Sequence, residues 1–323
     1  PSTPYTANKA GKGPAWDNSL FEDNAEFGYG MLLAQNAIRD GLKGKVEAVA
    51  ANERASEDVK AACKEWLDTY SVGALNGAAT DKLVAALDGI DCATCKDIVK
   101  NKDFLAKKSQ WIFGGDGWAY DIGFNGVDHV LASGKDINIM VFNTEVYSNT
   151  GGQSSKATPT GAVAQFAAGG KEVKQKDLAA IAMSYGYVYV AQISMGADMN
   201  QTIKAIAEAE AYPGPSLIIA YAPCINHGIK KGMAKAQTEE KLAVQSGYWN
   251  LFRFNPAAEG KKFSLDCKPA TVDYQEFIKG EVRYTSLALK NPARAEKLFA
   301  KAEQNAKDKY AYLEKLVTLY DEQ

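Results

Sequence analysis

The chain has 323 residues, of which 46% are apolar and 24% charged, and its formal net charge is −2. It lacks an apolar run near the ~20 residues of a membrane span, an apolar core of a secretory signal in residues 1–16, and the cysteine spacing of a secreted disulfide scaffold. We therefore expect none of these classes and instead a cytoplasmic globular protein of about two domains by length, with no membrane or nucleic-acid partner.

The first third of the chain is predicted to contain a loop and several helices. Residues 1–17 are rich in Gly, Pro and Lys and are predicted as loop, and residues 20–39 as a helix with an apolar face. From 45 to 108, helical periodicity alternates with polar breaks at 71–73 and 89–91. Such a pattern is typical of a helical insertion on one side of a sheet.

From residue 110 onward, apolar runs alternate with helical patterns. The predicted strands are 110–114, 137–142, 187–192, 216–221 and 249–254. The predicted helices lie at about 120–133, 161–168, 177–185, 198–211 and 237–247. This alternation predicts an α/β fold with a mostly parallel sheet covered by helices on both faces.

The C-terminal part is predicted as a loop and a helical extension. Residues 256–269 form a lysine-bearing loop, and residues 291–321 form one long charged helix. We expect a single α/β domain over 1–323, with a helical insertion at 41–108 and a helical tail at 270–323.

Two predicted strands end in polar residues that suit metal and phosphate chemistry. The first strand stops at Gly114-Gly115-Asp116-Gly117, and the second stops at Asn143-Thr144 after one intervening helix. Because ligands of parallel α/β sheets bind beyond the carboxyl ends of the strands, Asp116 and Thr144 are predicted to lie next to each other.

The residue types at these strand ends favour Mg²⁺ and a diphosphate. Mg²⁺ prefers oxygen ligands and is commonly shared between carboxylates, water and substrate phosphates. Asp116 offers a carboxylate, Thr144 a hydroxyl and Val146 a backbone carbonyl. Gly115 and Gly117 lack a Cβ, so a phosphate can approach the main chain there.

The same residues carry a family resemblance. Gly115-Asp116-Gly117 followed by Asn143 resembles the thiamine diphosphate signature. Longer stretches resemble the C-terminal cofactor-binding region of pyruvate:ferredoxin (flavodoxin) oxidoreductases. These stretches are 20–31, 114–171 and 211–229, within a resemblance that covers roughly 1–40 and 111–254. Family subunits are several times longer, so we expect this chain to be one domain of a longer multidomain subunit that is inactive by itself.

The resemblance implies an activity and its cofactors. Pyruvate would be oxidatively decarboxylated with coenzyme A to acetyl-CoA and carbon dioxide, and electrons would pass through iron–sulfur clusters to ferredoxin or flavodoxin. Thiamine diphosphate, Mg²⁺ and a [4Fe-4S] cluster are the implied cofactors, and a homodimer is the implied assembly. The implied cofactor-binding residues are Gly115, Asp116, Gly117, Trp118, Asn143, Thr144 and Val146, with Asp116, Thr144 and Val146 on the metal.

Two further residues receive roles from the resemblance. Asn149 lies in the Ser/Thr/Asn/Gly-rich loop 147–159, which must cross the mouth of the site, and is predicted to position substrate. The resemblance also implies that Cys224 supplies one thiolate of a four-iron cluster. Such a cluster usually has four thiolate ligands. A Cys after a buried strand is by itself most often a core residue.

Other readings of the sequence stay open. One alternative is a cluster or zinc site, for which the chain offers four cysteines: Cys63, Cys92, Cys95 and Cys224. Otherwise Cys92 and Cys95 are free thiols or a redox pair. Cys267 receives no role. His227 is expected either to tune a cluster or to be a surface or core residue. The glutamate that activates the aminopyrimidine of thiamine is expected on another domain, and Glu145 is no match for it.

Alternative functions also remain. These are a related 2-oxoacid:ferredoxin oxidoreductase, another thiamine enzyme such as a decarboxylase or carboligase, and a non-catalytic module that holds the cofactor for a partner subunit.

Overall fold

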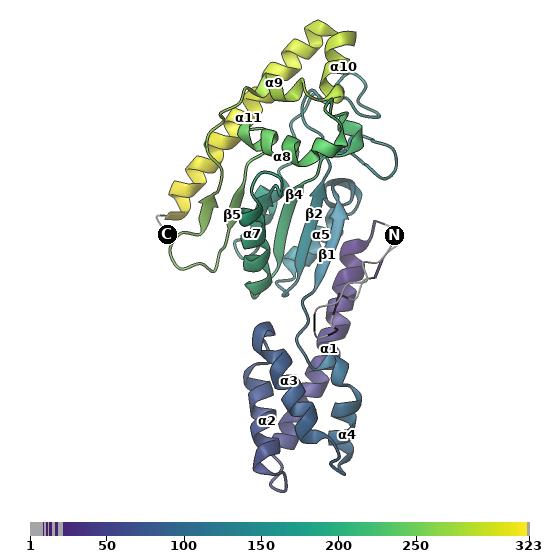
Figure 1. Cartoon of the computed structure of the whole chain (residues 1–323), viewed down its shortest axis with the longest axis vertical. Helices are drawn as coiled ribbons and strands as arrows, with labels where there is room; N and C mark the ends of the chain where they lie inside the picture. The colour runs from purple at the N-terminus through teal and green to yellow at the C-terminus, as the bar shows by residue number, and fades with distance from the viewer. Residues whose placement is uncertain (1–8, 10, 12, 15–16, 19–21, 322–323) are drawn as a thin grey trace. The chain divides into compact units, whose positions relative to one another are not determined.

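The computed structural model describes residues 9, 11, 13–14, 17–18 and 22–321. The chain divides into two compact units, one comprising Gly28–Gln110 and the other comprising Pro1–Phe27 with Trp111–Gln323. Figure 1 colours the elements along the chain. The predicted loop 1–17 and the predicted helix start at Leu20 lie largely outside the described residues.

The first unit is helical. It contains most of α1 (Asn24–Ala50), together with α2 (Glu57–Asp68), α3 (Gly73–Leu87), α4 (Ala93–Lys100) and the short η1 (Lys102–Phe104). The polar break predicted at 71–73 falls between α2 and α3 and reaches the first residue of α3, and the break at 89–91 falls between α3 and α4. The unit begins before the predicted insertion boundary at 41, because α1 continues without a break through Ala50.

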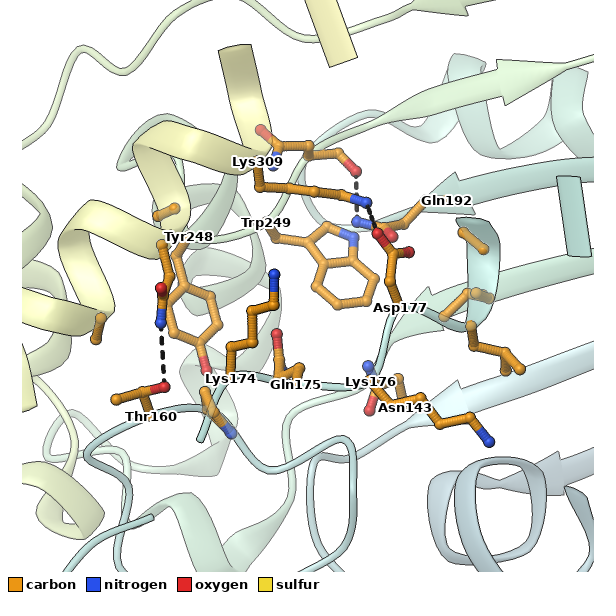
Figure 2. A pocket seen from close by; sticks show the side chains of 18 of the residues that line it. Asn143, Thr160, Lys174, Gln175, Lys176, Asp177, Gln192, Tyr248, Trp249 and Lys309 are labelled. Atoms are coloured by element: carbon orange, nitrogen blue, oxygen red, sulfur yellow. Dashed lines mark hydrogen bonds and ion pairs between the residues drawn. The ribbon is translucent and has the colours of Figure 1, made fainter. Parts of the chain in front are cut away.

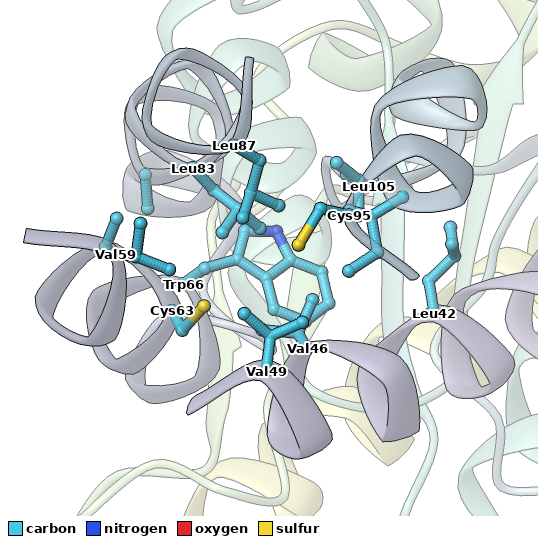
Figure 3. Close-up of a cluster of buried hydrophobic side chains, with 13 residues drawn as sticks. Leu42, Val46, Val49, Val59, Cys63, Trp66, Leu83, Leu87, Cys95 and Leu105 are labelled. Carbon is cyan, nitrogen blue, oxygen red and sulfur yellow. The ribbon is translucent and has the colours of Figure 1, made fainter. Parts of the chain in front are cut away.

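A separate hydrophobic core stabilises this helical unit. Trp66 is fully buried and its Nε1 donates to Thr80 Oγ1 over 3.1 Å. Figure 3 shows its indole surrounded by aliphatic side chains from α1, α2 and α3, including Val46, Leu83 and Leu87. Cys63 and Cys95 belong to the same core, so their thiols contribute packing in the way that apolar groups do.

The second unit contains a six-stranded sheet. Its strands are β1 (Trp111–Gly115), β2 (Asn138–Asn143), β3 (Tyr189–Ile193), β4 (Ser216–Tyr221), β5 (Phe252–Phe254) and β6 (Phe263–Leu265). They run in the order β1-β2-β4-β3-β5-β6. The first four pair in parallel, whereas β5 pairs antiparallel with β3 and β6 antiparallel with β5. The predicted mostly parallel sheet is thus confirmed.

Helices accompany the strands as expected of an α/β fold. They are the π-helix η2 (Gly117–Ile122), α5 (Phe124–Ala132), α6 (Leu178–Met183), α7 (Met199–Ala211), η3 (Ile225–His227), η4 (Met233–Lys235), α8 (Ala236–Gln245), α9 (Tyr274–Ile278), α10 (Val282–Lys290) and α11 (Pro292–Asp321). The last of these is the long charged helix predicted for 291–321.

Both faces of the sheet are buried by helices. Successive side chains of a strand point to opposite faces, and in β4 both Leu217 and Ile218 are fully buried. On one face Ile218 packs with Met140, Ala205 and Ala209, the last two from α7. The apolar character of consecutive strand residues follows from this double coverage.

The helix predicted for 161–168 is wrong. Several backbone groups there bond to partners outside the segment: Gly161 N–H donates to Lys171, Val163 to Arg283 and Gln165 to Gly152. Gly161 and Phe166 have positive φ angles of 84° and 64°, which a right-handed helix does not accommodate. Interactions with remote segments therefore override the local helical pattern.

The end of the sheet also differs from prediction. The loop predicted for 256–269 contains strand β6, and β5 is shorter than the predicted 249–254. Strands of three residues are too short to produce a recognisable alternation of apolar and polar side chains. Among the helices of the described residues, none is both long and apolar enough to cross a membrane.

Candidate functional site

Asp116 lies at the carboxyl end of β1, where the strand meets η2. Its side chain is 1% exposed, and its two carboxylate oxygens accept hydrogen bonds from two other segments. Oδ1 accepts from Thr144 Oγ1 at 2.8 Å, and Oδ2 accepts from Ser155 Oγ at 2.5 Å. The predicted proximity of Asp116 and Thr144 is therefore confirmed.

Three oxygen donors converge at this point. Thr144 Oγ1 lies 2.8 Å from Asp116 Oδ1 and 3.0 Å from the carbonyl oxygen of Val146. The sheet register explains the convergence, because Gly115 of β1 is paired with Phe142 of β2, so both strands end at the same edge. These two contacts of hydrogen-bond length bring together a carboxylate, a hydroxyl and a carbonyl. They form an oxygen-rich set of the kind that hard cations bind.

The carboxyl group of Asp116 is electrostatically poised for a cation. Burial raises the pKa of Asp116 to about 6, although the Ser155 and Thr144 hydroxyls donate to it and oppose the rise. Among the described residues, no ion pair joins Asp116 to a basic side chain. A buried carboxylate without a counter-charge is costly, and a bound cation would remove that cost.

The glycines around Asp116 serve different purposes. A Cβ on Gly117 would lie 2.5 Å from the ring of Tyr147, so the lack of a Cβ at this position leaves room for that ring. A Cβ on Gly115 would meet nothing within 4 Å, so that position faces open space. Of the two predicted phosphate approaches, only the one at Gly115 has room beside the main chain.

Trp118 packs inside the α/β unit. Its ring occupies the space left by Gly114 and Gly123, at whose positions a Cβ would come within 2.2 Å and 2.1 Å of the indole. The predicted contact between Trp118 and a cofactor stays a prediction.

Asn143 is buried at the end of β2, and its Oδ1 accepts from the backbone N–H of Glu145 at 3.1 Å. It also lines a cavity of about 170 Å³ that does not include Asp116 or Thr144. Figure 2 shows Asn143 on one side of this cavity, with Tyr248, Trp249 and Lys309 among the other lining side chains. Lys309 is paired there with Asp177.

The loop 147–159 contributes residues that the sequence did not single out. Ser148 Oγ donates to Thr144 Oγ1 at 2.7 Å, and Ser155 Oγ donates to the second carboxylate oxygen of Asp116. Asn149 is exposed in the same loop. A depression of about 390 Å³ adjoins the loop. The residues that line it are Glu22, Ile122, Tyr147, Thr150, Gln153, Ser154 and Phe166. One serine hydroxyl among many in a polar loop carries no signal that marks it in advance.

The Cys224 loop follows β4, the strand beside β2. The Cys224 thiol is buried and its Sγ accepts from Asn226 N at 3.5 Å and Asn226 Nδ2 at 3.4 Å. Asn226 in turn lies against the 147–159 loop, because a Cβ on Gly152 would come within 2.9 Å of it. The loops after β1, β2 and β4 therefore meet around one edge of the sheet.

His227 is a core residue and not a surface residue. It is fully buried, and its Nε2 donates to the carbonyl oxygen of Thr144 at 2.8 Å. Its Nδ1 lies 3.5 Å from Glu281 Oε1. The imidazole therefore links the Cys224 loop directly to the Thr144 loop.

Glu145 and Arg283 form a buried ion pair next to the oxygen donors, which the sequence did not reveal. Arg283 Nη2 donates to Glu145 Oε2 at 2.8 Å, and Arg283 Nε donates to Glu281 Oε2 at 2.7 Å. Burial opposes the charge on Arg283, but Glu281, Tyr248 and Glu145 hold its pKa above its usual range. Burial likewise opposes ionisation of Glu281, but Arg283 and His227 hold its pKa below its usual range. Glu145 is thus paired with Arg283.

The cysteines do not assemble into a metal site within the described residues. Cys63, Cys92 and Cys95 belong to the helical unit and Cys224 to the other. No group of three or more His, Cys, Asp or Glu side chains in the described part of the chain is placed to hold a metal. The four-cysteine assembly considered from the sequence would need cysteines of both units and stays a prediction.

Comparison with known proteins identifies a domain family for the segment that carries this site. Residues 99–220, which include β1, β2 and all three oxygen donors, match the family described as thiamine pyrophosphate enzyme, C-terminal TPP binding domain. Thiamine pyrophosphate is thiamine diphosphate under another name.

Three similar relatives cover nearly the whole chain. It is 52% identical to a pyruvate-flavodoxin oxidoreductase of Klebsiella pneumoniae, over 98% of this chain and 27% of that protein. It is 55% identical to a pyruvate:ferredoxin oxidoreductase of Moorella thermoacetica, over 98% of this chain and 28% of that protein. It is 53% identical to a pyruvate-flavodoxin oxidoreductase of Enterobacter agglomerans, over 98% and 28% respectively.

The chain therefore spans a little over a quarter of the length of these relatives. The family match over residues 99–220 includes the Gly-Asp-Gly turn and the Asn143-Thr144 turn. The chain belongs to the family of pyruvate:ferredoxin and pyruvate:flavodoxin oxidoreductases, in the part of these proteins that contains the thiamine diphosphate-binding domain.

Proposed function

We propose that this chain holds the Mg²⁺ and diphosphate of thiamine diphosphate in an enzyme that oxidises pyruvate. The observation that carries the proposal is the convergence of Asp116 Oδ1, Thr144 Oγ1 and the Val146 carbonyl oxygen, joined by contacts of 2.8 and 3.0 Å. Mg²⁺ takes such oxygen donors and completes its shell with water and phosphate oxygens.

The residues present fit this ion. Asp116 supplies a charge that is buried without a basic partner among the described residues, and its raised pKa reflects that burial. The open space beside Gly115 leaves the main chain accessible to a diphosphate. Asp116, Thr144 and Val146 would hold the metal, with Gly115 and Asn143 close to the diphosphate.

When bound, thiamine diphosphate supplies a carbon nucleophile and an electron sink, while the protein supplies binding and orientation. The overall reaction would convert pyruvate and coenzyme A to acetyl-CoA, carbon dioxide, a proton and two electrons. Ferredoxin or flavodoxin would accept the electrons, as the names of the relatives indicate for those proteins. Asn149, exposed in the loop beside the metal residues, would position the substrate.

Cys224 is proposed as one ligand of an iron–sulfur cluster beside this site. Its place after β4, next to the Thr144 loop, supports the proposal. A cluster usually needs four thiolates, and the described residues around Cys224 supply no group of three or more ligands. The remaining thiolates would have to come from other parts of a longer subunit.

The test is anaerobic reduction of a viologen dye by the complete protein, with the Asp116→Asn variant beside it. Reduction that needs both pyruvate and coenzyme A, and that is lost in the variant, supports the proposal. The matched control is Asp198→Asn. Asp198 is the N-cap residue of α7, the helix that follows β3 in the chain, and asparagine caps a helix equally well.

Other outcomes identify the alternatives. Acetaldehyde or acetolactate formed without dye reduction would make the chain part of another thiamine enzyme. Reduction with a different 2-oxo acid but not with pyruvate would indicate a related oxidoreductase. Intact cofactor binding with no turnover would favour a non-catalytic module that holds the cofactor.

A further inference from the structure

The backbone between Thr144 and Val146, two of the three residues whose oxygens converge, has an unusual conformation. Glu145, which separates Thr144 from Val146, has a φ of 59°. Such left-handed values are uncommon for residues other than glycine and persist only where surrounding structure enforces them. Directly after this residue, the Val146 carbonyl oxygen lies 3.0 Å from Thr144 Oγ1.

The side chain of Glu145 is fixed by three donors. Its Oε2 accepts from Tyr248 OH at 2.6 Å and from Arg283 Nη2 at 2.8 Å, and its Oε1 accepts from Gln175 Nε2 at 3.0 Å. The backbone is fixed too, since its N–H donates to Asn143 Oδ1 and its carbonyl accepts from Thr158 Oγ1 at 2.5 Å. Glu145 is fully buried, so none of these bonds competes with water.

The same buried network also reaches Thr144. Arg283 binds Glu281, Glu281 lies beside His227, and His227 donates to the Thr144 carbonyl. The ion-paired side chains of Arg283, Glu281 and Glu145 are 0–1% exposed. Removing one member of such a buried network leaves an unpaired charge, so the arrangement is held as a unit.

We propose that Glu145 is a positioning residue of the magnesium site: its ion pair with Arg283 holds the left-handed backbone that presents the Val146 carbonyl to the metal. The His227–Glu281 arm of the network fixes the other side of the kink through the Thr144 carbonyl. This inference rests on the proposed magnesium function, and it assigns to Glu145 a role that acts through the backbone beside the Val146 carbonyl.

The test compares Glu145→Gly with Glu145→Ala in the complete protein. Both variants lose the carboxylate and leave Arg283 without this partner, so both lose the same ion pair. They differ in the backbone, because glycine adopts φ near +60° at no steric cost and alanine does not. Mg²⁺ is titrated in the presence of thiamine diphosphate and followed by tryptophan fluorescence, and thermal unfolding is measured in parallel.

The expected result is that alanine weakens Mg²⁺ affinity about tenfold or more, and that glycine recovers at least about fivefold of that loss. The recovery occurs although glycine does not restore thermal stability. A residue with a purely structural role would give Mg²⁺ affinities that follow the thermal stabilities of the variants, so glycine would improve affinity over alanine only as far as it improves stability.

Two further variants complete the design. Tyr248→Phe removes one donor to Glu145 but keeps the ion pair, and we expect it to fold and to weaken Mg²⁺ affinity about two- to fivefold. Arg253→Gln is the matched control, because it breaks a part-buried ion-pair group with Glu208 and Asp266 elsewhere in the sheet. It should lower stability and leave Mg²⁺ affinity unchanged.

The outcomes separate this inference from the function on which it rests. If the wild-type protein shows no Mg²⁺-dependent binding of thiamine diphosphate, the proposed function and the inference both fall. If the wild type binds but glycine and alanine lose affinity equally, or Tyr248→Phe loses none, only the inference is overturned.

Discussion

Asp116 combines a functional charge with an energetic cost to the fold. Its carboxylate is almost fully buried and hydrogen-bonded to Thr144 and Ser155. In the absence of a cation, this buried charge is poorly compensated and lowers the stability of the fold. Residues that bind a ligand often destabilise the ligand-free protein in this way.

Asp116→Asn should therefore separate stability from binding. Asparagine keeps the size of the side chain and one acceptor while it removes the buried charge, so the cation-free variant should unfold at the same or a higher temperature than the wild type. Thermal unfolding in chelator at pH 7 measures this. A clear loss of stability, of more than about 1 kcal/mol, would mean that the carboxylate stabilises the fold.

The cation-free protein should also lose stability with rising pH. The pKa of Asp116 is about 6 in the folded protein against an ordinary 3.8, so its contribution is fully present below pH 3.8 and is lost as the pH rises through 6. The difference corresponds to about 3 kcal/mol. Urea unfolding between pH 4 and 7 should show this decline in the wild type, and Asp116→Asn should lack it.

Saturating Mg²⁺ with thiamine diphosphate should abolish the same decline, because the ligands bind the ionised carboxylate. An identical pH profile in wild type and Asp116→Asn would contradict the assignment of the titration to Asp116.

The residue-level prediction from sequence succeeded where strand ends determine position. Asp116 and Thr144 are 28 residues apart, but both follow apolar strands that pair in parallel, so their proximity follows from the fold. Ser155 and Arg283 were not predicted. Ser155 reaches Asp116 from a loop without periodicity, and Arg283 meets Glu145 across 138 residues of sequence.

At the scale of elements, the turn between β1 and η2 has two glycines with distinct roles. Gly115→Ala adds a methyl group in open space, whereas Gly117→Ala brings one to 2.5 Å from Tyr147. We expect Gly115→Ala to leave the stability of the cation-free protein within about 0.5 kcal/mol and to weaken binding of thiamine diphosphate. Gly117→Ala should cost about 1–3 kcal/mol of stability, as overpacked sites do.

Thermal unfolding and a thiamine diphosphate titration of the two variants check this pair. Equal destabilisation by both substitutions would contradict the geometry of the turn, and unchanged cofactor affinity in Gly115→Ala would contradict a diphosphate beside Gly115.

Local patterns predicted the long elements better than the short ones. Strand β4 and helix α11 have strong apolar or helical periodicity and were found within one residue of their predicted bounds. The segment 161–168 instead pairs with Lys171, Arg283 and Gly152, and β6 has only three residues. In both cases tertiary hydrogen bonds decide the conformation, and a local pattern does not contain them.

At the scale of the whole molecule, the two compact units have separate cores. Leu83 is fully buried in the helical unit, in a cluster formed only by residues of that unit. Leu83→Ala should therefore cost about 2–5 kcal/mol and increase hydrogen exchange within Gly28–Gln110, while Mg²⁺ and thiamine diphosphate affinities stay unchanged.

The matched control is Leu217→Ala, in the buried strand β4 of the other unit. It should increase exchange in the sheet and weaken cofactor binding. A loss of cofactor affinity in Leu83→Ala as large as in Leu217→Ala would show that the helical unit takes part in the site.

The central claim is that Asp116, Thr144 and Val146 bind the magnesium ion of thiamine diphosphate. The most direct measurement is calorimetric titration of thiamine diphosphate into the complete protein, with and without Mg²⁺, for wild type, Asp116→Asn and Thr144→Ala. We predict binding that requires Mg²⁺, a loss of at least about 100-fold in Asp116→Asn, and a smaller loss in Thr144→Ala. Wild-type affinity in Asp116→Asn, or equal affinity without Mg²⁺, would contradict the claim.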